Sequence, residues 1–222
     1  MTLAMGIWIG DDDQINNQQI LHMKKILSEY DQKYFDAIYV GNEVLFRNEK
    51  TSSQLAQYIN QVKSYISQMN YDIKVGTTEI NSKIDPIIVE ASDVVGANIH
   101  PFFGGDHVKQ ATSWVLNAFE HQIKPINNLV DNPAQLVLSE VGWPSGGGSF
   151  LNSVAGYNEM QIFLDTFVCE AKKIDTPWYF FEAFDEPWKE IYYTDDSQWE
   201  TEWGIFTDDR KLKPGIVLPT CQ

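Results

Sequence analysis

Two glutamates stand where apolar runs of this sequence end, and both are candidates for acid-base or nucleophilic chemistry. Glu43 ends one run and Glu140 ends another. Two carboxyl groups flanking a glycosidic bond are what most glycoside hydrolases use to cleave it. The alternative is that each glutamate merely begins a solvated loop. The neighbours of the pair, Asn42 and Trp143-Pro144, favour the catalytic interpretation over the loop interpretation.

The elements that must position these glutamates follow from hydrophobic periodicity. Apolar runs alternate with stretches of helical spacing, which is typical of a parallel sheet with crossover helices. The predicted strands are Thr2–Ile9, Ala37–Gly41, Lys74–Thr78, Val94–Ile99, Gln135–Ser139 and Trp178–Ala183. The predicted helices are Asn17–Tyr30, Ser52–Met69, Asp85–Ala91, Val108–Leu129 and Val154–Lys173, with a last helix near Lys213. In a (β/α)8 barrel, active sites lie at the C-terminal strand ends, where both glutamates fall.

The number of units is lower than a complete TIM barrel requires. We count six βα units, whereas a full eightfold barrel takes about 250 residues. The sequence predicts one α/β domain over residues 1–222, an incomplete barrel whose first and last strands stay unpaired. We expect a signal peptide and two βα units, roughly 60–80 residues, to precede Met1 in the natural protein. Such open edges predict poor solubility and weak or no activity for the chain made alone.

Composition excludes several classes of partner. Lysine and arginine against aspartate and glutamate give 16 − 31 = −15, so the surface repels nucleic acid and anionic membranes. A neutral polysaccharide meets no such repulsion, and 13% aromatic residues supply faces for sugar rings. No apolar run is long enough to span a bilayer. The histidines are scattered, and Asp11-Asp12-Asp13 suits a helix N-terminus better than a metal site, so we infer neither metal nor cofactor.

The two cysteines leave two alternatives open. Cys169 falls on the helix before the last predicted strand, and Cys221 follows the last helix-like segment. Those elements neighbour each other on a barrel's outer ring, so a disulfide is feasible. Two unpaired thiols would instead suit a cytosolic protein.

Seven stretches at or near predicted strand ends carry a resemblance to a known family. They are Gly6-Ile7-Trp8-Ile9 with Asp11-Asp12-Asp13, Val40-Gly41-Asn42-Glu43-Val44-Leu45-Phe46-Arg47, Val75-Gly76-Thr77, Ala97-Asn98-Ile99-His100-Pro101-Phe102-Phe103, Ser139-Glu140-Val141-Gly142-Trp143-Pro144-Ser145, Phe181-Glu182-Ala183-Phe184-Asp185-Glu186-Pro187-Trp188-Lys189 and Trp203-Gly204-Ile205-Phe206. In this order they resemble glycoside hydrolase family 17, and within it the fungal cell-wall β-1,3-glucanases and glucanosyltransferases. The resemblance covers essentially the whole chain and implies barrel strands three to eight.

The resemblance implies roles for the pair. Glu140 would be the nucleophile and Glu43 the acid/base, with carboxyls about 5–5.5 Å apart for a retaining mechanism. Asn42 would hydrogen-bond the substrate 2-hydroxyl. Asn98 and His100 lie where another strand ends and are expected substrate-binding residues, and a lone histidine there favours a hydrogen-bonding role over a catalytic one. We expect Phe102, Trp143 and Phe184 to be partly exposed and to line one groove with the glutamates; placement in the core is the alternative.

A second polar set follows the last predicted strand. The resemblance places Glu186 and Lys189 in a network beside the acid/base, with Glu182 at helical spacing and Glu200 as a further carboxylate. The alternative is an exposed cluster of salt bridges. Support of the acid, rather than bond-making, is the expected role.

The resemblance therefore implies a retaining enzyme that cleaves internal β-1,3-glucan linkages by hydrolysis, transglycosylation or both. It also implies a monomer located outside the cell or in the wall. A non-catalytic glucan-binding or wall-structural protein is a second hypothesis. A related barrel glycosidase acting on another β-glucan or a mannan is a third.

Overall fold

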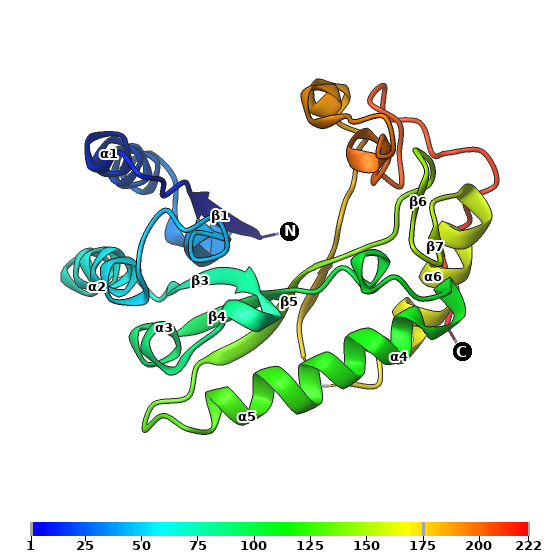
Figure 1. Ribbon diagram of the computed structural model, residues 1–222. Helices are drawn as coiled ribbons and strands as arrows, with labels where there is room; N and C mark the ends of the chain where they lie inside the picture. The colour runs from blue at the N-terminus through cyan, green and yellow to red at the C-terminus, as the bar shows by residue number, and fades with distance from the viewer. Residues whose placement is uncertain (1, 175, 222) are drawn as a thin grey trace. The chain divides into compact units, whose positions relative to one another are not determined.

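The computed structural model describes residues 2–174 and 176–221, and parallel strands alternate with helices along them (Figure 1). The parallel strands are β1 (Leu3–Ile7), β2 (Phe35–Asn42), β3 (Lys74–Ile80), β4 (Val94–Asn98), β5 (Gln135–Val141) and β8 (Trp178–Phe180). The helices are α1 (Asp13–Glu29), α2 (Ser52–Gln68), α3 (Pro86–Ala91), α4 (Val108–Ala118), α5 (Lys124–Asn127) and α6 (Tyr157–Ala171). The strand order β1-β2-β3-β4-β5-β8 follows the chain, as the predicted barrel-type fold requires.

The described chain forms two compact units. The first runs to Asn98 and includes His121–Val137, and the second comprises Ile99–Glu120 and the residues from Leu138 onward. In the first unit β1 to β4 are parallel, with Asn42 of β2 opposite Thr78 of β3. In the second unit the later part of β5 is parallel to β8. Each glutamate of interest thus belongs to a different unit.

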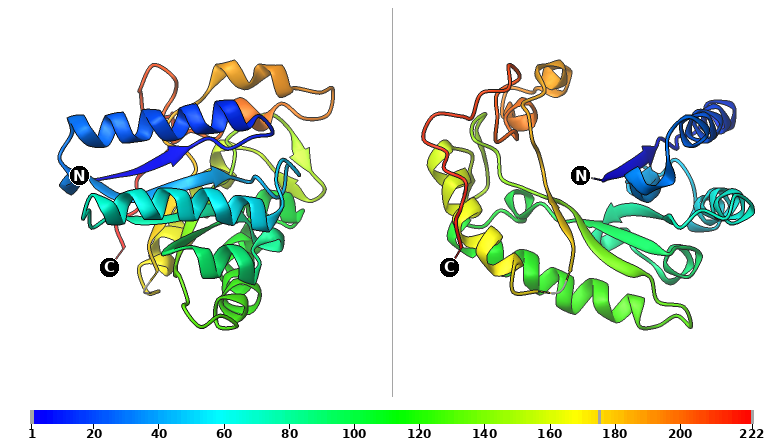
Figure 2. Two further views of the ribbon diagram at one scale, coloured as in Figure 1. Left: turned by 90° about the vertical axis from the view of Figure 1, so that its left-hand side faces the viewer. Right: turned by 180° about the vertical axis from the view of Figure 1, so that it is seen from behind.

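The first unit buries one face of each long helix against the sheet. α2 buries Leu55, Ile59, Val62 and Ile66, and this helical spacing is the one that the sequence displays. Its N-terminus is a capping box between Thr51 and Gln54. Figure 2 shows α1 and α2 side by side, and Tyr58 of α2 donates a hydrogen bond to Asp13 of α1 at 2.8 Å.

Asp12 explains the acidic run before α1. Its side chain accepts the main-chain N–H groups of Gln14 and Ile15, which makes it the N-cap of the helix, in line with the predicted N-terminal charge. None of the helices in residues 2–174 and 176–221 is long and apolar enough to cross a bilayer.

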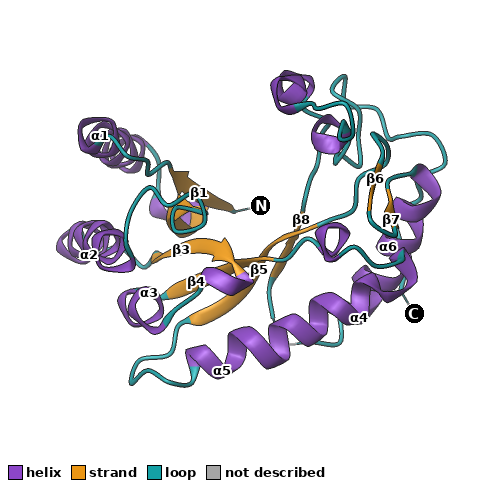
Figure 3. Cartoon of the chain, in the orientation of Figure 1, coloured by secondary structure: helices purple, strands orange, loops and turns teal. Residues whose placement is uncertain are grey.

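The second unit is built around aromatic side chains. Trp143 meets Phe102 edge to face at 5.3 Å between ring centroids, and Phe163 stacks on Phe167 at the same centroid distance. α4 and α6 are joined by a hydrogen bond of 2.8 Å between the hydroxyl groups of Thr112 and Thr166. A short antiparallel hairpin, β6 (Ser149–Phe150) and β7 (Ser153–Val154), completes the regular elements (Figure 3).

Two helix predictions need correction. The helix expected over Val108–Leu129 is α4 followed by a π-helical turn at Phe119–Ile123 and the short helix α5. Pro125, the second residue of α5, has no N–H group to continue an α-helical hydrogen-bond ladder. The last helix expected near Lys213 is wrong, because Pro214 and Gly215 break the pattern there.

Lys213 is instead one of the most buried side chains of the second unit, at 1% exposure. Its Nζ atom donates to Asp185 Oδ1 and to Ser145 Oγ, each at 2.6 Å, and lies 3.5 Å from Glu202 Oε2. Burial raises the pKa of Asp185, against the Lys213 hydrogen bond that lowers it. One cation thus holds the C-terminal segment against the loop that follows β8.

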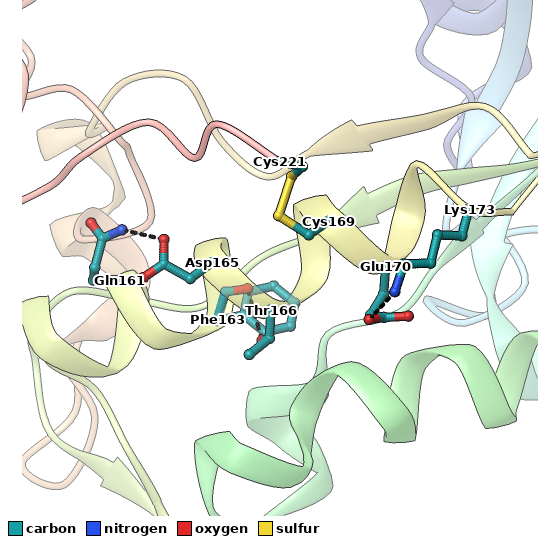
Figure 4. The surroundings of a disulfide bond; sticks show 8 residues. All are labelled: Gln161, Phe163, Asp165, Thr166, Cys169, Glu170, Lys173 and Cys221. Carbon is teal, nitrogen blue, oxygen red and sulfur yellow. Dashed lines mark hydrogen bonds and ion pairs between the residues drawn. A yellow bond between two sulfur atoms is a disulfide. The ribbon is translucent and has the colours of Figure 1, made fainter.

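The disulfide alternative for the cysteines is confirmed. Cys169 on α6 is bonded to Cys221, with their Cα atoms 5.3 Å apart (Figure 4). The bond ties the C-terminal segment to a helix of the same unit.

Loss of the disulfide should lower stability through the unfolded chain. The closed loop spans 52 positions, for which the chain-entropy model gives about 4 kcal/mol. We expect the double variant Cys169→Ser/Cys221→Ser to lose a free energy of unfolding of that order in urea titrations. Dithiothreitol should destabilise the wild type and leave the double variant unchanged. Equal sensitivity of both proteins to the reductant would contradict the expectation.

Removing the buried cation should be far more costly than removing an exposed one. Lys213→Met leaves Asp185 buried without its charge partner, a change that costs about 3–5 kcal/mol. The matched control is Lys211→Met, which breaks a solvent-exposed pair with Asp209 and should have no measurable effect. Urea titration of both variants checks this. Similar losses in the two would show that burial of Lys213 is energetically unimportant.

Candidate active site

Glu43 lies just beyond β2 in a backbone conformation that few residues adopt. Its φ angle is +55°, and its N–H donates to Thr78 O of β3 at 2.9 Å. Gly41, two positions earlier, has φ +83°, and a Cβ atom there would meet a methyl group of Val44 at 2.4 Å. Only glycine therefore permits this approach to the turn. The chain changes direction sharply where the glutamate emerges.

The Glu43 side chain is half-buried and held by asparagine. Asn98 Nδ2, at the end of β4, donates to Glu43 Oε1 at 3.0 Å and to Asn42 Oδ1 at 2.9 Å. Thr78 Oγ1 also donates to Asn42 Oδ1, at 2.6 Å. The structure thus brings together the predicted residues Glu43, Asn42 and Asn98 at the C-terminal ends of β2 and β4. Their functional roles stay predictions.

Arg47 braces the turn after Glu43 from one side. Its guanidinium pairs with Glu49 Oε2 at 2.6 Å, donates to Asn42 O, and lies 4.2 Å from the centroid of the exposed Trp8 ring. The Arg47 N–H donates to Glu43 O at 2.9 Å, which closes the turn.

Glu79 of β3 also holds this turn, and it is not among the residues that the sequence singles out. It lies in β3 with no exposed surface. Its Oε1 accepts the Leu45 N–H at 2.7 Å, and its Oε2 accepts the Phe46 N–H at 3.4 Å. Burial raises the pKa of Glu79 to about 7, helped by the nearby Glu43 charge and opposed by the two N–H groups and Arg47. The missed signal was an acidic residue continuing an apolar run that we ended at Thr78.

In the second unit, Glu140 near the end of β5 has a histidine partner. His100 Nε2 lies 3.0 Å from Glu140 Oε2. The imidazole meets the rings of Phe181 and Trp203 edge to face, each with centroids 5.1 Å apart. Its Nδ1 is buried and has no hydrogen-bond partner among the described residues. A proton on Nδ1 would leave an unsatisfied donor, so the Nε2–H tautomer that donates to Glu140 is favoured.

The exposure expected for two aromatic residues is wrong. Phe102 and Trp143 are both fully buried, whereas Phe184 is 43% exposed as expected. The Trp143 Nε1 donates to Val154 O at 2.9 Å, which satisfies its polar atom inside the unit. These two rings therefore pack the core beneath the loops instead of offering a face to sugar. Phe103, next to Phe102, is the exposed ring of that pair at 43%.

The polar set after β8 is a compact ion cluster. Lys189 Nζ lies 2.6 Å from Glu186 Oε2 and 3.3 Å from Glu182 Oε1, with only 13% of the lysine side chain exposed. Burial raises the pKa of Glu182 to about 7, and the Lys189 charge opposes that rise. Glu200 lies in a short 3₁₀ helix, Trp199–Thr201, and no ion pair joins it to Lys189 in the described part of the chain. The alternative of an exposed cluster of salt bridges does not fit, because the Lys189 side chain is largely buried.

The cluster predicts a pH-dependent cost of losing its lysine. A carboxyl group whose pKa is higher in the folded than in the unfolded protein stabilises the fold most at low pH. That stability is lost as the pH rises through the pKa of the folded state. Lys189→Met removes a charge that lowers the pKa of Glu182. The free energy of unfolding lost on this substitution should therefore grow with pH. We expect about 3 kcal/mol at pH 8 and clearly less at pH 5. Urea titrations against wild type at both pH values measure it.

The control for this experiment is Lys173→Met, which breaks an exposed pair with Glu170 on α6 and should show no pH-dependent difference. An equal cost of Lys189→Met at the two pH values would show that Glu182 does not titrate between them.

Comparison with known proteins gives the family. Residues 1–204 match the model of the BtgE/BtgC glycoside hydrolase domain. The chain is 37% identical to the probable glucan endo-1,3-beta-glucosidase btgC of Aspergillus flavus over 237 aligned positions, and 35% identical to glucan endo-1,3-beta-glucosidase btgC of Emericella nidulans. Both alignments cover 100% of this chain but only 34% and 36% of those proteins. The chain thus spans about a third of the length of these curated relatives.

Solved structures agree with the sequence comparison. The glycoside hydrolase family 17 β-1,3-glucanosyltransferase of Rhizomucor miehei is 29% identical, with a TM-score of 0.87 over 99% of this chain and 77% of that one. An active-site mutant of the same enzyme, in complex with laminaritriose, gives 28% identity and a TM-score of 0.88 with the same coverage of both chains. The predicted resemblance to family 17 is confirmed, and the chain belongs to the family of BtgE/BtgC glycoside hydrolase domains.

Proposed function

We propose that the chain is a retaining glycoside hydrolase that cleaves internal β-1,3-glucan linkages, with Glu43 as acid/base and Glu140 as nucleophile. The observation that carries the proposal is how the two carboxylates are held. Each is half-buried at or just beyond a strand end, and each has a hydrogen-bond partner, Asn98 or His100, from one three-residue segment of chain.

The chemistry follows from these partners. His100 engages Oε2 of Glu140, which leaves Oε1 as the oxygen that attacks the anomeric carbon. As the new carbon–oxygen bond forms, Glu43 gives its proton to the leaving sugar oxygen. Glu43 then takes a proton from water or from a sugar hydroxyl, which displaces Glu140 from the anomeric carbon. Water gives hydrolysis, and a sugar hydroxyl gives transglycosylation. No cofactor takes part.

The substrate class is supported by the relatives and by charge. The btgC proteins are named as endo-1,3-β-glucosidases, and the Rhizomucor enzyme as a β-1,3-glucanosyltransferase. A net charge of −15 suits an uncharged polysaccharide partner rather than nucleic acid. Asn42, beside Glu43, is the proposed partner of the substrate 2-hydroxyl, and the exposed Phe184 is a proposed sugar contact.

We further propose a monomer that works outside the cell or in the wall. The disulfide between Cys169 and Cys221 supports an oxidising compartment, because such bonds are rare in the cytosol.

Substitution of either glutamate should separate binding from turnover. We expect Glu140→Gln and Glu43→Gln each to lower kcat on laminarin by about 10³-fold or more, with oligosaccharide binding retained. Glu29→Gln on α1 makes the same charge change at an exposed position and should behave as wild type. Reducing-end release and calorimetric binding of laminarin oligosaccharides are the measurements. Turnover that survives Glu140→Gln would remove the nucleophile assignment, and binding without turnover in the wild type would favour a glucan-binding protein.

The stereochemical course tests the mechanism independently. Retention predicts that the β-anomer of the new reducing end appears first in proton NMR spectra, before mutarotation. First appearance of the α-anomer would mean inversion, which requires carboxyls farther apart than the proposed 5–5.5 Å. Products longer than the donor would assign transglycosylation.

A further inference from the structure

We propose that Glu79 is a positioning residue for Glu43: its buried carboxyl group fixes the turn that presents Glu43. The assignment of Glu43 as acid/base rests on the proposed function. The contact arguments for Glu79 rest on the first unit alone.

The first step is the pair of main-chain hydrogen bonds. Leu45 and Phe46 are the second and third residues after Glu43, and their N–H groups point at Glu79 Oε1 and Oε2 at 2.7 and 3.4 Å. The carboxylate acts toward this turn as an N-cap acts toward a helix, by satisfying main-chain donors with no partner in the turn. The anchor comes from β3, a rigid strand paired on both edges.

The second step is backbone strain at Glu43. A residue with a side chain at φ +55° is held in a sparsely populated conformation, which persists only where its surroundings over-determine it. The Glu43 N–H bonded to Thr78 O fixes one end of the turn, and Glu79 fixes the next two residues. Both anchors are consecutive residues of β3, so the register of this strand sets the direction of the Glu43 side chain.

The third step is burial. The Glu79 side chain has no exposed surface, and the Leu45 and Phe46 N–H groups are its hydrogen-bond donors from the turn. Breaking these bonds would leave buried polar groups unsatisfied, so the contact is costly to lose.

The test uses Glu79→Gln, Glu79→Asp and the control Glu29→Gln in the full chain. The glutamine keeps an acceptor oxygen for the Leu45 N–H at the same reach, whereas the aspartate keeps the carboxyl group and shortens the reach. The separate values of kcat and KM on laminarin are the first readout, and amide exchange at Leu45 and Phe46 is the second.

In Glu79→Asp we expect kcat to fall by about 10²-fold with KM little changed, and the turn amides to exchange faster, because misplacement of about 1 Å costs that much. In Glu79→Gln we expect kcat and amide exchange close to those of wild type, because the acceptor oxygen stays in reach of Leu45. Glu29→Gln should match wild type. Unchanged kcat in Glu79→Asp overturns positioning, and a loss in Glu79→Gln as large as in Glu79→Asp overturns the role of the acceptor oxygen.

The two proposals fail differently. A wild-type chain without laminarin turnover contradicts the proposed function. Amide exchange at Leu45 and Phe46 in Glu79→Asp still decides whether Glu79 holds the turn.

Discussion

Three buried or half-buried carboxylates organise loops within the two units, one in the first and two in the second, and each is stable only because N–H groups meet it. An ionised carboxylate removed from water costs several kcal/mol unless it is paired and hydrogen-bonded. Glu79 meets two main-chain N–H groups, Glu182 meets Lys189, and Asp185 meets Lys213 and the Gly204 N–H. Each arrangement pins a loop to a strand or to a second loop. In a chain of net charge −15, cations for this purpose are scarce, and two of the three carboxylates use a lysine with at most 13% of its side chain exposed.

The sheet concentrates polar groups at its C-terminal edge for the same reason. The inner parts of β2, β3 and β4 are almost wholly buried, so a polar side chain has a place only where the strand ends or where a neighbouring turn supplies donors. Asn42, Glu43 and Asn98 occupy such ends. Glu79 is within the strand but satisfied by the turn above it. In the second unit, Glu140 lies near the end of β5 in the same way.

Sequence reasoning located the elements and the glutamates because their signals are periodic or local. The spacing of apolar residues predicts the strands and the long helices, and the position of Glu43 and Glu140 at the ends of apolar runs singles out the two glutamates. The burial of Phe102 and Trp143 could not be predicted from the sequence, because an aromatic side chain after a strand can face either solvent or the core. The contacts that bury Trp143 come from Phe163 and Val154, which are not adjacent to it in the sequence. The sequence predicts a last helix near Lys213 and gives no sign of its burial, because that burial depends on Asp185, 28 positions away.

The two catalytic candidates have partners of different kinds, and this difference supports their assigned roles. Asn98 donates to one oxygen of Glu43, so the other oxygen is able to carry a proton without breaking that bond. His100 donates through Nε2 to Glu140, while its buried Nδ1 disfavours the alternative tautomer that would accept a proton from a carboxylic acid. The hydrogen bonds around the two carboxyls therefore differ. A ring N–H is directed at Glu140 Oε2, whereas a side-chain amide N–H group that also meets Asn42 Oδ1 is directed at Glu43 Oε1. A nucleophile and an acid/base need different environments, and this difference in partners supplies one.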